Sequence, residues 1–410
     1  MKGFATKAIH CGAMKKDVHG ALRVPIYDNV TFEFESARAI QLAFEGRSLG
    51  HSYTRISNPT VEDLEERIRI LTDARGVVAV SSGMAAIANV ILVLAETGGN
   101  IISTRCLFGN TYSLFEHTLK PWGLGINYID LTEADNLKRA INEKTRAVFL
   151  ETITNPQLQV VDIAKISKIA AGFNVPVILD GTVTTPYLFR SKDFGVAIEV
   201  ISSTKYISGG GTTVGGLIID NGIQDWSACP RLKDTAKKYG PYALIAHLRR
   251  EAYRNLGSCM APHNAYFQTL GLETLGLRID KSCENALALA RFLESRREVK
   301  SVNYPGLENS PCHELAKNQF GNKFGGILTF TLADRKACYK LIDSLTIIRR
   351  ATNINDNKTL ILHPASTIFC EYSEEEKNEL GVPSNMIRLA VGIEDREDII
   401  DDLKKGLESL

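Results

Sequence analysis

Lys205 is the residue of this 410-residue chain whose surroundings most clearly suggest chemistry. A short apolar run, Val200–Ile201, leads through small hydroxyl residues to the lysine, and a glycine-rich turn, Gly209–Gly211, follows it. This arrangement presents an amine at the end of a sheet strand with little bulk around it. Such an amine can form a Schiff base with an aldehyde. Taken alone, the residue could equally be an ordinary surface lysine, because most lysines are exposed.

Asp180 ends an earlier apolar run, Val175–Asp180, about one strand–helix–strand step before the lysine. Two neighbouring parallel strands would bring Asp180 and Lys205 to the same edge of a sheet. Pyridoxal 5'-phosphate needs this pair, since a lysine binds its aldehyde carbon and a carboxylate keeps its ring nitrogen protonated. An aspartate that ends a strand is also a common turn former. Only the combination therefore indicates a cofactor site.

A candidate phosphate site precedes both residues. Ser82, Gly83 and Met84 follow the apolar run Gly76–Val80 and precede a helix that we predict over Ala85–Ala95. The free amides and positive dipole end of such a helix attract a phosphate, although a serine there can simply cap the helix. The chain has neither of the common glycine-rich nucleotide motifs, so this site does not indicate a nucleotide.

Composition excludes several classes of function. The net charge is +1 and charged residues make up 23% of the chain, which indicates neither a nucleic-acid partner nor an acidic membrane surface. Eight cysteines without a CxxC pair argue against a metal site or a disulfide scaffold and suit the cytoplasm. No signal peptide is evident, and the longest apolar stretch is too short to cross a bilayer.

Alternating apolar strands and helices predict an α/β fold, with a doubly wound, mainly parallel sheet and a smaller α+β domain at the C-terminal end. We expect an extended N-terminal arm over residues 1–55, a large cofactor-binding domain over 56–255 and a small domain over 256–410. The predicted strands are Val77–Val80, Ile101–Ser103, Ile126–Ile129, Ala147–Glu151, Val177–Asp180, Val200–Ser203, Gly326–Leu332 and Met386–Val391.

These motifs, together with four further segments, resemble the Cys/Met-metabolism family of pyridoxal-phosphate enzymes over nearly the whole chain. The further segments are YTRISNPT (Tyr53–Thr60), ETITNPQLQVVDI (Glu151–Ile163), HPAST (His363–Thr367) and IRLAVGIED (Ile387–Asp395). The resemblance implies the aspartate-aminotransferase fold (fold type I) and a homotetramer built of catalytic dimers.

The resemblance also implies a role for each matching residue. Lys205 corresponds to the Schiff-base lysine and proton shuttle, and Asp180 to the partner of the ring nitrogen. The other implied contacts with the phosphate are the main-chain amides of Gly83 and Met84 beside Ser82, and the hydroxyls of Ser202 and Thr204. The side chain of Asn155 corresponds to the contact with the cofactor's 3-hydroxyl, and Tyr53 and Arg55 to the pair that reaches the phosphate of a neighbouring subunit. Arg388 corresponds to the clamp for the substrate's α-carboxylate.

Within the family, three features resemble the O-acetylhomoserine sulfhydrylase branch: the segment Asn221–Arg278, the tail after HPAST, and Asn353 at a substrate-side position where lyases usually carry serine. This branch converts O-acetyl-L-homoserine and sulfide to L-homocysteine and acetate in methionine biosynthesis. The substrates implied are an acyl-homoserine and a sulfur donor, with no metal. Methionine γ-lyase, the cystathionine γ-lyase and synthase activities, and an O-succinylhomoserine substrate remain alternatives.

Phe108 departs from the family pattern, which usually has a tyrosine that stacks on the cofactor and assists proton transfer. A phenylalanine keeps the stacking surface and loses the hydroxyl. A thiolate leaving group needs more acid assistance than acetate, so Phe108 favours an acyl-homoserine substrate. Two further departures, Gly181 with Val183 and the arm residues 28–30, are expected to reshape the substrate pocket.

Overall fold

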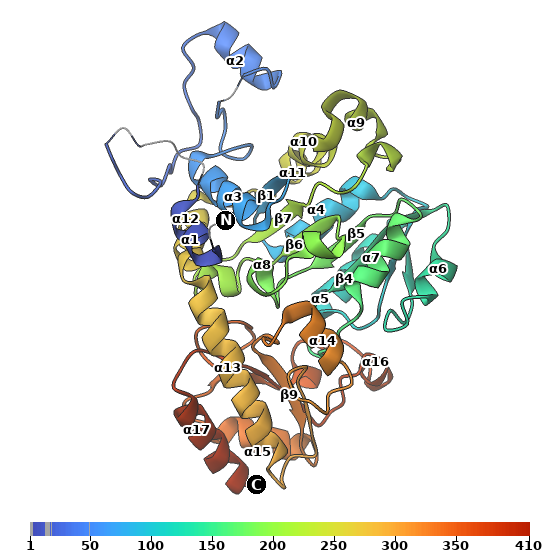
Figure 1. Cartoon of the computed structure of the whole chain (residues 1–410), viewed down its shortest axis with the longest axis vertical. Helices are drawn as coiled ribbons and strands as arrows, with labels where there is room; N and C mark the ends of the chain where they lie inside the picture. The colour runs from blue at the N-terminus through green and yellow to red at the C-terminus, as the bar shows by residue number, and fades with distance from the viewer. Residues whose placement is uncertain (1–2, 13–16, 18, 49) are drawn as a thin grey trace.

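The computed structural model describes residues 3–12, 17, 19–48 and 50–410 (Figure 1), and it confirms the predicted α/β class. Its larger sheet has seven strands in the order β1-β7-β6-β5-β4-β2-β3. The strands β6, β5, β4, β2 and β3 are mutually parallel, whereas β7 is antiparallel to both of its neighbours. Their bounds are β1 Gly76–Val80, β2 Asn100–Ser103, β3 Gly125–Tyr128, β4 Thr145–Glu151, β5 Val177–Asp180, β6 Ile198–Ile201 and β7 Gly216–Asp220.

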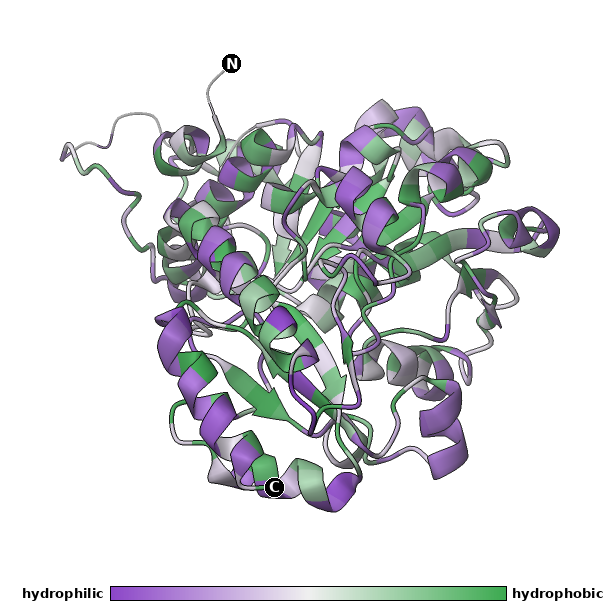
Figure 2. Cartoon of the chain, turned by 60° about the horizontal axis from the view of Figure 1, so that its bottom comes forward, coloured by the Kyte–Doolittle hydropathy of each residue, from purple (hydrophilic) through white to green (hydrophobic). Residues whose placement is uncertain are grey.

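Helices cover both faces of this sheet because its strands are apolar on both sides (Figure 2). Val148, Leu150 and Leu179 belong to one buried cluster, while Phe149 and Ile178 belong to another on the opposite face. The helices that precede or connect these strands are α3 Pro59–Thr72, α4 Gly83–Leu94, α5 Gly109–Ser113, α6 Asn136–Ala140, α7 Ile163–Ala171 and α8 Thr185–Leu188. A π-helical turn, Leu114–Leu119, continues α5.

Three short helices follow the sheet: α9 Lys233–Tyr239, α10 Ala243–Arg250 and α11 Ala252–Leu256. The chain then returns to the sheet as α12 Pro262–Glu273, and the long helix α13 Leu275–Glu294 leads to the second sheet (Figure 1). The sequence predicts a helix over Cys283–Arg296, which corresponds to only the second half of α13. Its first half includes the polar residues Arg278 and Ser282, which are nevertheless buried because each is hydrogen-bonded within the protein.

The second sheet has five strands in the order β10-β11-β12-β9-β8. These are β8 Ser301–Asn303, β9 Ile327–Thr331, β10 Arg349–Arg350, β11 Leu360–Leu362 and β12 Met386–Ala390, and the accompanying helices are α14 His313–Phe320, α15 Arg335–Ser344, α16 Glu374–Glu379 and α17 Arg396–Glu408. The predicted strands at β9 and β12 are therefore present, while β8, β10 and β11 are too short to give a clear period-two signal. The division into an arm, a large domain and a small domain remains our proposal.

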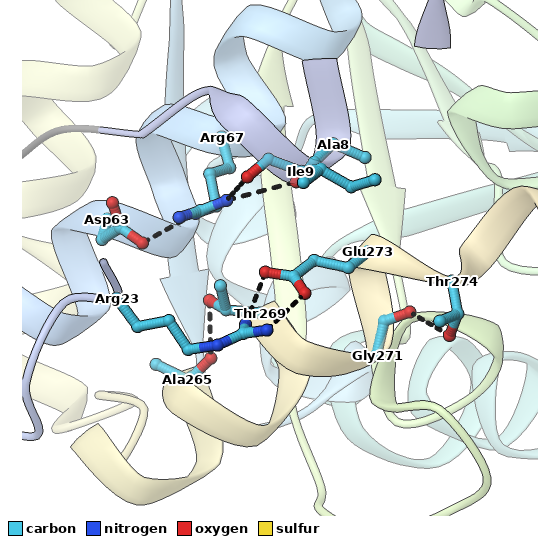
Figure 3. Close-up of polar contacts among 10 residues, drawn as sticks. All are labelled: Ala8, Ile9, Arg23, Asp63, Arg67, Ala265, Thr269, Gly271, Glu273 and Thr274. Atoms are coloured by element: carbon cyan, nitrogen blue, oxygen red, sulfur yellow. Dashed lines mark hydrogen bonds and ion pairs between the residues drawn. The ribbon is translucent and has the colours of Figure 1, made fainter. Parts of the chain in front are cut away.

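The N-terminal segment contains two helices, α1 Phe4–His10 and α2 Ala37–Phe44, where we expected an extended arm. Ser36 caps α2 by accepting from Ala39, which is the local signal for this helix. Figure 3 shows how the segment is attached: Arg67 of α3 donates to the carbonyls of Ala8 and Ile9. A second anchor is the bidentate ion pair from Arg23 to Glu273 of α12. The predicted arm also includes residues 1–2, 13–16, 18 and 49, which lie outside the described residues.

β7 is the main element that we did not predict in the large sheet. A glycine-rich loop with one short 3-10 turn, rather than a crossover α-helix, separates it from β6, so the chain returns directly and the two strands pair antiparallel. Among the described helices, none combines the length and the apolar composition that crossing a membrane requires.

Candidate active site

A cavity of about 490 Å³ lies where the parallel strands of the large sheet end. Ligand sites in open α/β sheets are usually found at this edge. Ten of the predicted site residues line the cavity: Ser82, Gly83, Met84, Phe108, Asn155, Asp180, Ser202, Thr204, Lys205 and Arg388. They come from segments spread over some 300 residues, and the fold therefore brings together most of what the sequence singled out.

Asp180 and Lys205 reach the cavity from neighbouring strands, as predicted. Asp180 is the last residue of β5 and pairs in register with Val200 of β6. Lys205 follows β6 after a three-residue turn, and a 3-10 helix, Tyr206–Ser208, begins immediately after it. The two side chains therefore lie at the same edge of the sheet, the carboxylate at the end of β5 and the amine just after β6.

Lys205 is a partly buried amine with a reduced affinity for its proton. Burial and the positive charge of Arg388 lower its pKa to about 8, and Asp356 opposes this shift. Its Nζ donates to Oδ1 of Asn353 at 2.7 Å. Since the pKa lies near neutrality, the amine exchanges protons readily at physiological pH, which suits a group that moves protons.

Glu151 places a second carboxyl group beside Asp180. It ends β4, pairs in register with Asp180, and is almost fully buried. Burial and the charge of Asp180 raise the pKa of Glu151 well above its ordinary value. Burial also raises the pKa of Asp180, whose Oδ1 accepts from the amide of Thr182 at 2.9 Å. Two adjacent carboxyl groups do not both ionise easily, and Glu151 is the one whose charged form is opposed by its neighbour as well as by burial.

Glu151 also holds two predicted site residues in place. Its carboxyl oxygens accept from the amide of Phe108 at 2.6 Å and from the amide of Asn155 at 3.3 Å. Glu151 begins one of the segments that resemble the family, but we predicted no role for it. The signal that could have identified it is its position at the end of a strand next to Asp180.

The first turn of α4 forms one wall of the cavity. Ser82 caps the helix by accepting from Ala85 at 3.1 Å, so capping and anion binding coexist here. The amides of Gly83 and Met84 have no helical carbonyl to reach. A Cβ on Gly83 would come within 2.6 Å of Cβ of Ser202, which shows how closely the helix approaches the turn before Lys205. This cradle of amides and hydroxyls fits a phosphate group.

Arg388 is a buried guanidinium that points into the cavity wall from β12. Its Nη1 donates to Oδ1 of Asn155 and its Nη2 to the carbonyl of Asn353, both at 3.1 Å. Its Nε is buried without a partner among the described residues. A buried cation of this kind binds an anion such as a carboxylate favourably, because the cost of desolvation has already been met in folding.

Tyr53 and Arg55 do not line the cavity of their own chain. They lie in the N-terminal segment, where the Arg55 guanidinium stands over the Tyr53 ring and donates to the carbonyl of Arg254. Tyr53 remains 39% exposed. Any part that these two residues play at a phosphate therefore requires another subunit.

A family model for "Cys/Met metabolism PLP-dependent enzyme" matches residues 5–408. An L-methionine γ-lyase of Fusobacterium nucleatum subsp. polymorphum is 36% identical over 100% of this chain and 98% of its own length. The solved O-acetylhomoserine sulfhydrylase of Wolinella succinogenes is 41% identical, with a TM-score of 0.79 over 99% of this chain and 100% of that one.

A solved Campylobacter jejuni protein, assigned as an O-acetylhomoserine (thiol)-lyase, is 34% identical, with a TM-score of 0.95 over 99% of this chain and 100% of that one. That structure carries an N'-pyridoxyl-lysine-5'-monophosphate. The amine, carboxylate and anion cradle described above fit the same group. The chain therefore belongs to the Cys/Met-metabolism family of PLP-dependent enzymes, and pyridoxal phosphate is its cofactor.

Proposed function

We propose that this protein catalyses a γ-replacement in which O-acetyl-L-homoserine and sulfide give L-homocysteine and acetate. The carbon–oxygen bond to acetate breaks at the γ-carbon, and a carbon–sulfur bond forms there. The observation that carries the proposal is Phe108, which lines the cavity without a hydroxyl. Acetate leaves as a stabilised carboxylate and needs little help from an acid, whereas a thiolate needs more.

The residues of the cavity supply the remaining steps. Arg388 binds the α-carboxylate of the substrate and thereby orients its α-carbon. Nζ of Lys205 takes the α-proton and later returns protons to the carbon chain. Asp180 would hold the protonated ring nitrogen of the bound cofactor. The chemistry that pyridoxal phosphate supplies when bound is an electron sink for the pair left by the departing proton.

Methionine γ-lyase is the second candidate, because the Fusobacterium relative with that activity covers the whole chain at 36% identity. Both reactions would use the same lysine, carboxylate and arginine. They differ in whether sulfide is consumed, and in whether ammonia and 2-oxobutyrate are released.

The proposal is tested by incubating the purified, cofactor-loaded enzyme with O-acetyl-L-homoserine, with and without sulfide, and measuring homocysteine and 2-oxobutyrate separately. O-succinyl-L-homoserine and L-methionine are parallel substrates, and Lys205→Ala is the inactive control. We expect homocysteine only with sulfide and little keto acid from methionine. Abundant 2-oxobutyrate from methionine without sulfide would instead identify a γ-lyase, and faster turnover of the succinyl ester would correct the acyl group.

A further inference from the structure

The segment of residues 352–357 runs between β10 and β11 and reaches from the second sheet to Lys205. Asn353 stands at its contact point: Oδ1 of its amide accepts from Nζ of Lys205 at 2.7 Å. The other end of the same amide, Nδ2, donates to Oδ2 of Asp356 at 3.0 Å. Lys205, Asn353 and Asp356 thus form a chain of two hydrogen bonds that ends on a carboxylate.

The direction of these two hydrogen bonds follows from which of the three groups can donate and which can accept. An asparagine amide has a donating and an accepting end, and by itself it can present either end to a neighbour. An ionised carboxylate only accepts, so the amide end that faces it must be the NH₂ group. The carbonyl oxygen is then the end that faces the lysine. We propose that Asp356 is a positioning residue, which holds the side chain of Asn353 with its oxygen toward Lys205.

The turn after Lys205 encloses this contact. Gly211 has a φ of +68°, and a Cβ there would lie 2.7 Å from Oδ2 of Asp356 and 2.9 Å from Nδ2 of Asn353. The glycine therefore lets the main chain close over the hydrogen bond between the two side chains. The bond is partly buried and has a charged acceptor, which strengthens it relative to a bond between neutral groups.

Asn353 also contacts the proposed carboxylate clamp. Its main-chain carbonyl accepts from Nη2 of Arg388 at 3.1 Å. One residue therefore supports the substrate-binding cation through its backbone and contacts the proton-transferring amine through its side chain. Only the side-chain contact depends on Asp356, and the two effects can be separated experimentally.

Two charged groups dominate the surroundings of Lys205. Arg388 lowers its pKa and the negative charge of Asp356 raises it. An amide oxygen facing the amine favours its protonated form, whereas an NH₂ group facing it would favour the neutral form. Loss of Asp356 removes the charge and the orientation together, and both changes make the amine easier to deprotonate.

The test measures Lys205 in the full-length, cofactor-free chain by the pH dependence of its acetylation, followed by mass spectrometry. Asp356→Leu removes both the acceptor and the charge, while Asp356→Asn removes the charge but retains an acceptor for Asn353. Asn357→Ala is the matched control, because Asn357 anchors the same segment to the carbonyl of Gly209 at 3.0 Å without contacting Asn353. Circular dichroism confirms that each variant is folded.

We expect Asp356→Leu to accelerate acetylation of Lys205 at pH 7 by roughly threefold to tenfold, since the neutral fraction of the amine rises. Asp356→Asn should give a smaller increase, and Asn357→Ala should match the wild-type protein. An unchanged rate in Asp356→Leu, or an equal increase in Asn357→Ala, would overturn the assignment. An increase in Asp356→Asn as large as that in Asp356→Leu would show that the charge alone acts, and it would also overturn the assignment. If Asp356→Leu does not fold, Asp356→Ala replaces it, because it too removes both the acceptor and the charge.

This inference rests on the role proposed for Lys205 but not on the identity of the substrate. Acetylation uses neither an acyl-homoserine nor sulfide, so a failed sulfhydrylase assay leaves its result intact. In the cofactor-loaded enzyme, Asp356→Leu should lower kcat roughly tenfold and leave KM within about twofold, because Arg388 keeps its own contacts.

Discussion

At the scale of single residues, Phe108 is the position that separates the two candidate reactions. Phe108→Tyr restores a hydroxyl in the cavity that can protonate a thiolate leaving group. We expect the variant to release 2-oxobutyrate from L-methionine at least about tenfold faster than the wild-type protein, a small part of the roughly 10²–10⁴-fold that a general acid typically contributes. Its turnover of O-acetyl-L-homoserine with sulfide should change by less than about threefold. An unchanged lyase rate would show that the hydroxyl does not limit this reaction.

Glu199 is a buried acid in β6 that does not line the cavity, and it should make stability depend on pH. Burial, with a contribution from Asp180, raises its pKa to about 8 from an ordinary value of 4.5. The folded protein therefore holds a proton that the unfolded chain releases, and this stabilisation is present below pH 4.5 and lost as the pH rises toward 8. We expect Glu199→Gln to lose less stability than the wild-type protein between pH 6 and pH 8.5 in thermal unfolding.

The control for this prediction is Asp234→Asn, which changes an exposed carboxylate on α9 and should leave the pH dependence as it is in the wild-type protein. Equal pH slopes in Glu199→Gln and the wild-type protein would show that Glu199 is ionised in the fold.

The position of Glu199 also accounts for Gly181, one of the departures from the family pattern. A Cβ on Gly181 would lie 2.1 Å from Oε1 of Glu199, so the acid occupies the space that a larger residue would need.

Most of the polar residues that line the cavity could be singled out from the sequence, because Lys205, Asp180 and Arg388 each stand out as polar residues beside apolar strands, and their roles remain proposals. Glu151, Glu199 and Asp356 were not assigned roles. Glu151 and Glu199 lie beside Asp180 and Gly181 at the end of a neighbouring strand. Asp356 contacts Asn353, whose own partner Lys205 is 148 residues away in the sequence. Such contacts depend on strand register and on loop conformation, which local residue patterns do not determine.

At the scale of elements, the first turn of α4 is the feature on which cofactor binding should depend most. Gly83→Ala introduces a Cβ that would meet Cβ of Ser202 at 2.6 Å and its Cα at 3.0 Å. Because main chain lies on both sides of this contact, the helix must move away from the turn. We expect at least about tenfold weaker binding of pyridoxal phosphate, together with a loss of stability of about 1–3 kcal/mol. Fluorescence titration with the cofactor measures the first effect and urea denaturation the second.

Met84→Ala is the matched variant for this element, since it keeps the main-chain amide and introduces no clash. It should retain the cofactor with an affinity within about threefold of the wild-type protein. If both variants weakened cofactor binding equally, side-chain bulk would govern the affinity, rather than the close approach of the helix to the turn before Lys205. If neither did, the phosphate would have to be held elsewhere in the cavity.

The elements around this turn show what sequence patterns can and cannot predict. The strands β1 to β6 were recognisable because each is a short apolar run that ends in polar or small residues. α4 was predicted to begin two residues too late, since Gly83 and Met84 do not look helical by themselves. β7 and the first half of α13 were missed, because their identity depends on the partners that they pack against.

At the scale of the whole molecule, the N-terminal segment leaves many apolar side chains without cover. α2 has no buried residue, and the exposed fractions are 56% for Val30 and 61% for Phe44. Tyr53 and Arg55 belong to the same segment and lie apart from their own cavity. These facts support the proposal that the segment packs on a second copy of the chain, and that Arg55 completes the phosphate site of that copy.

This proposal predicts complementation between two inactive variants. Arg55→Ala retains an intact Lys205, and Lys205→Ala retains an intact Arg55, so each alone should form only defective sites. A mixed dimer would contain one site with both residues and one site with neither. Random pairing makes half of the dimers mixed, and co-expression of the two variants should therefore restore roughly a quarter of the wild-type activity per chain. If Arg55 acted within its own subunit, no mixed dimer would contain an intact site, and the co-expressed protein would stay as inactive as the separate variants.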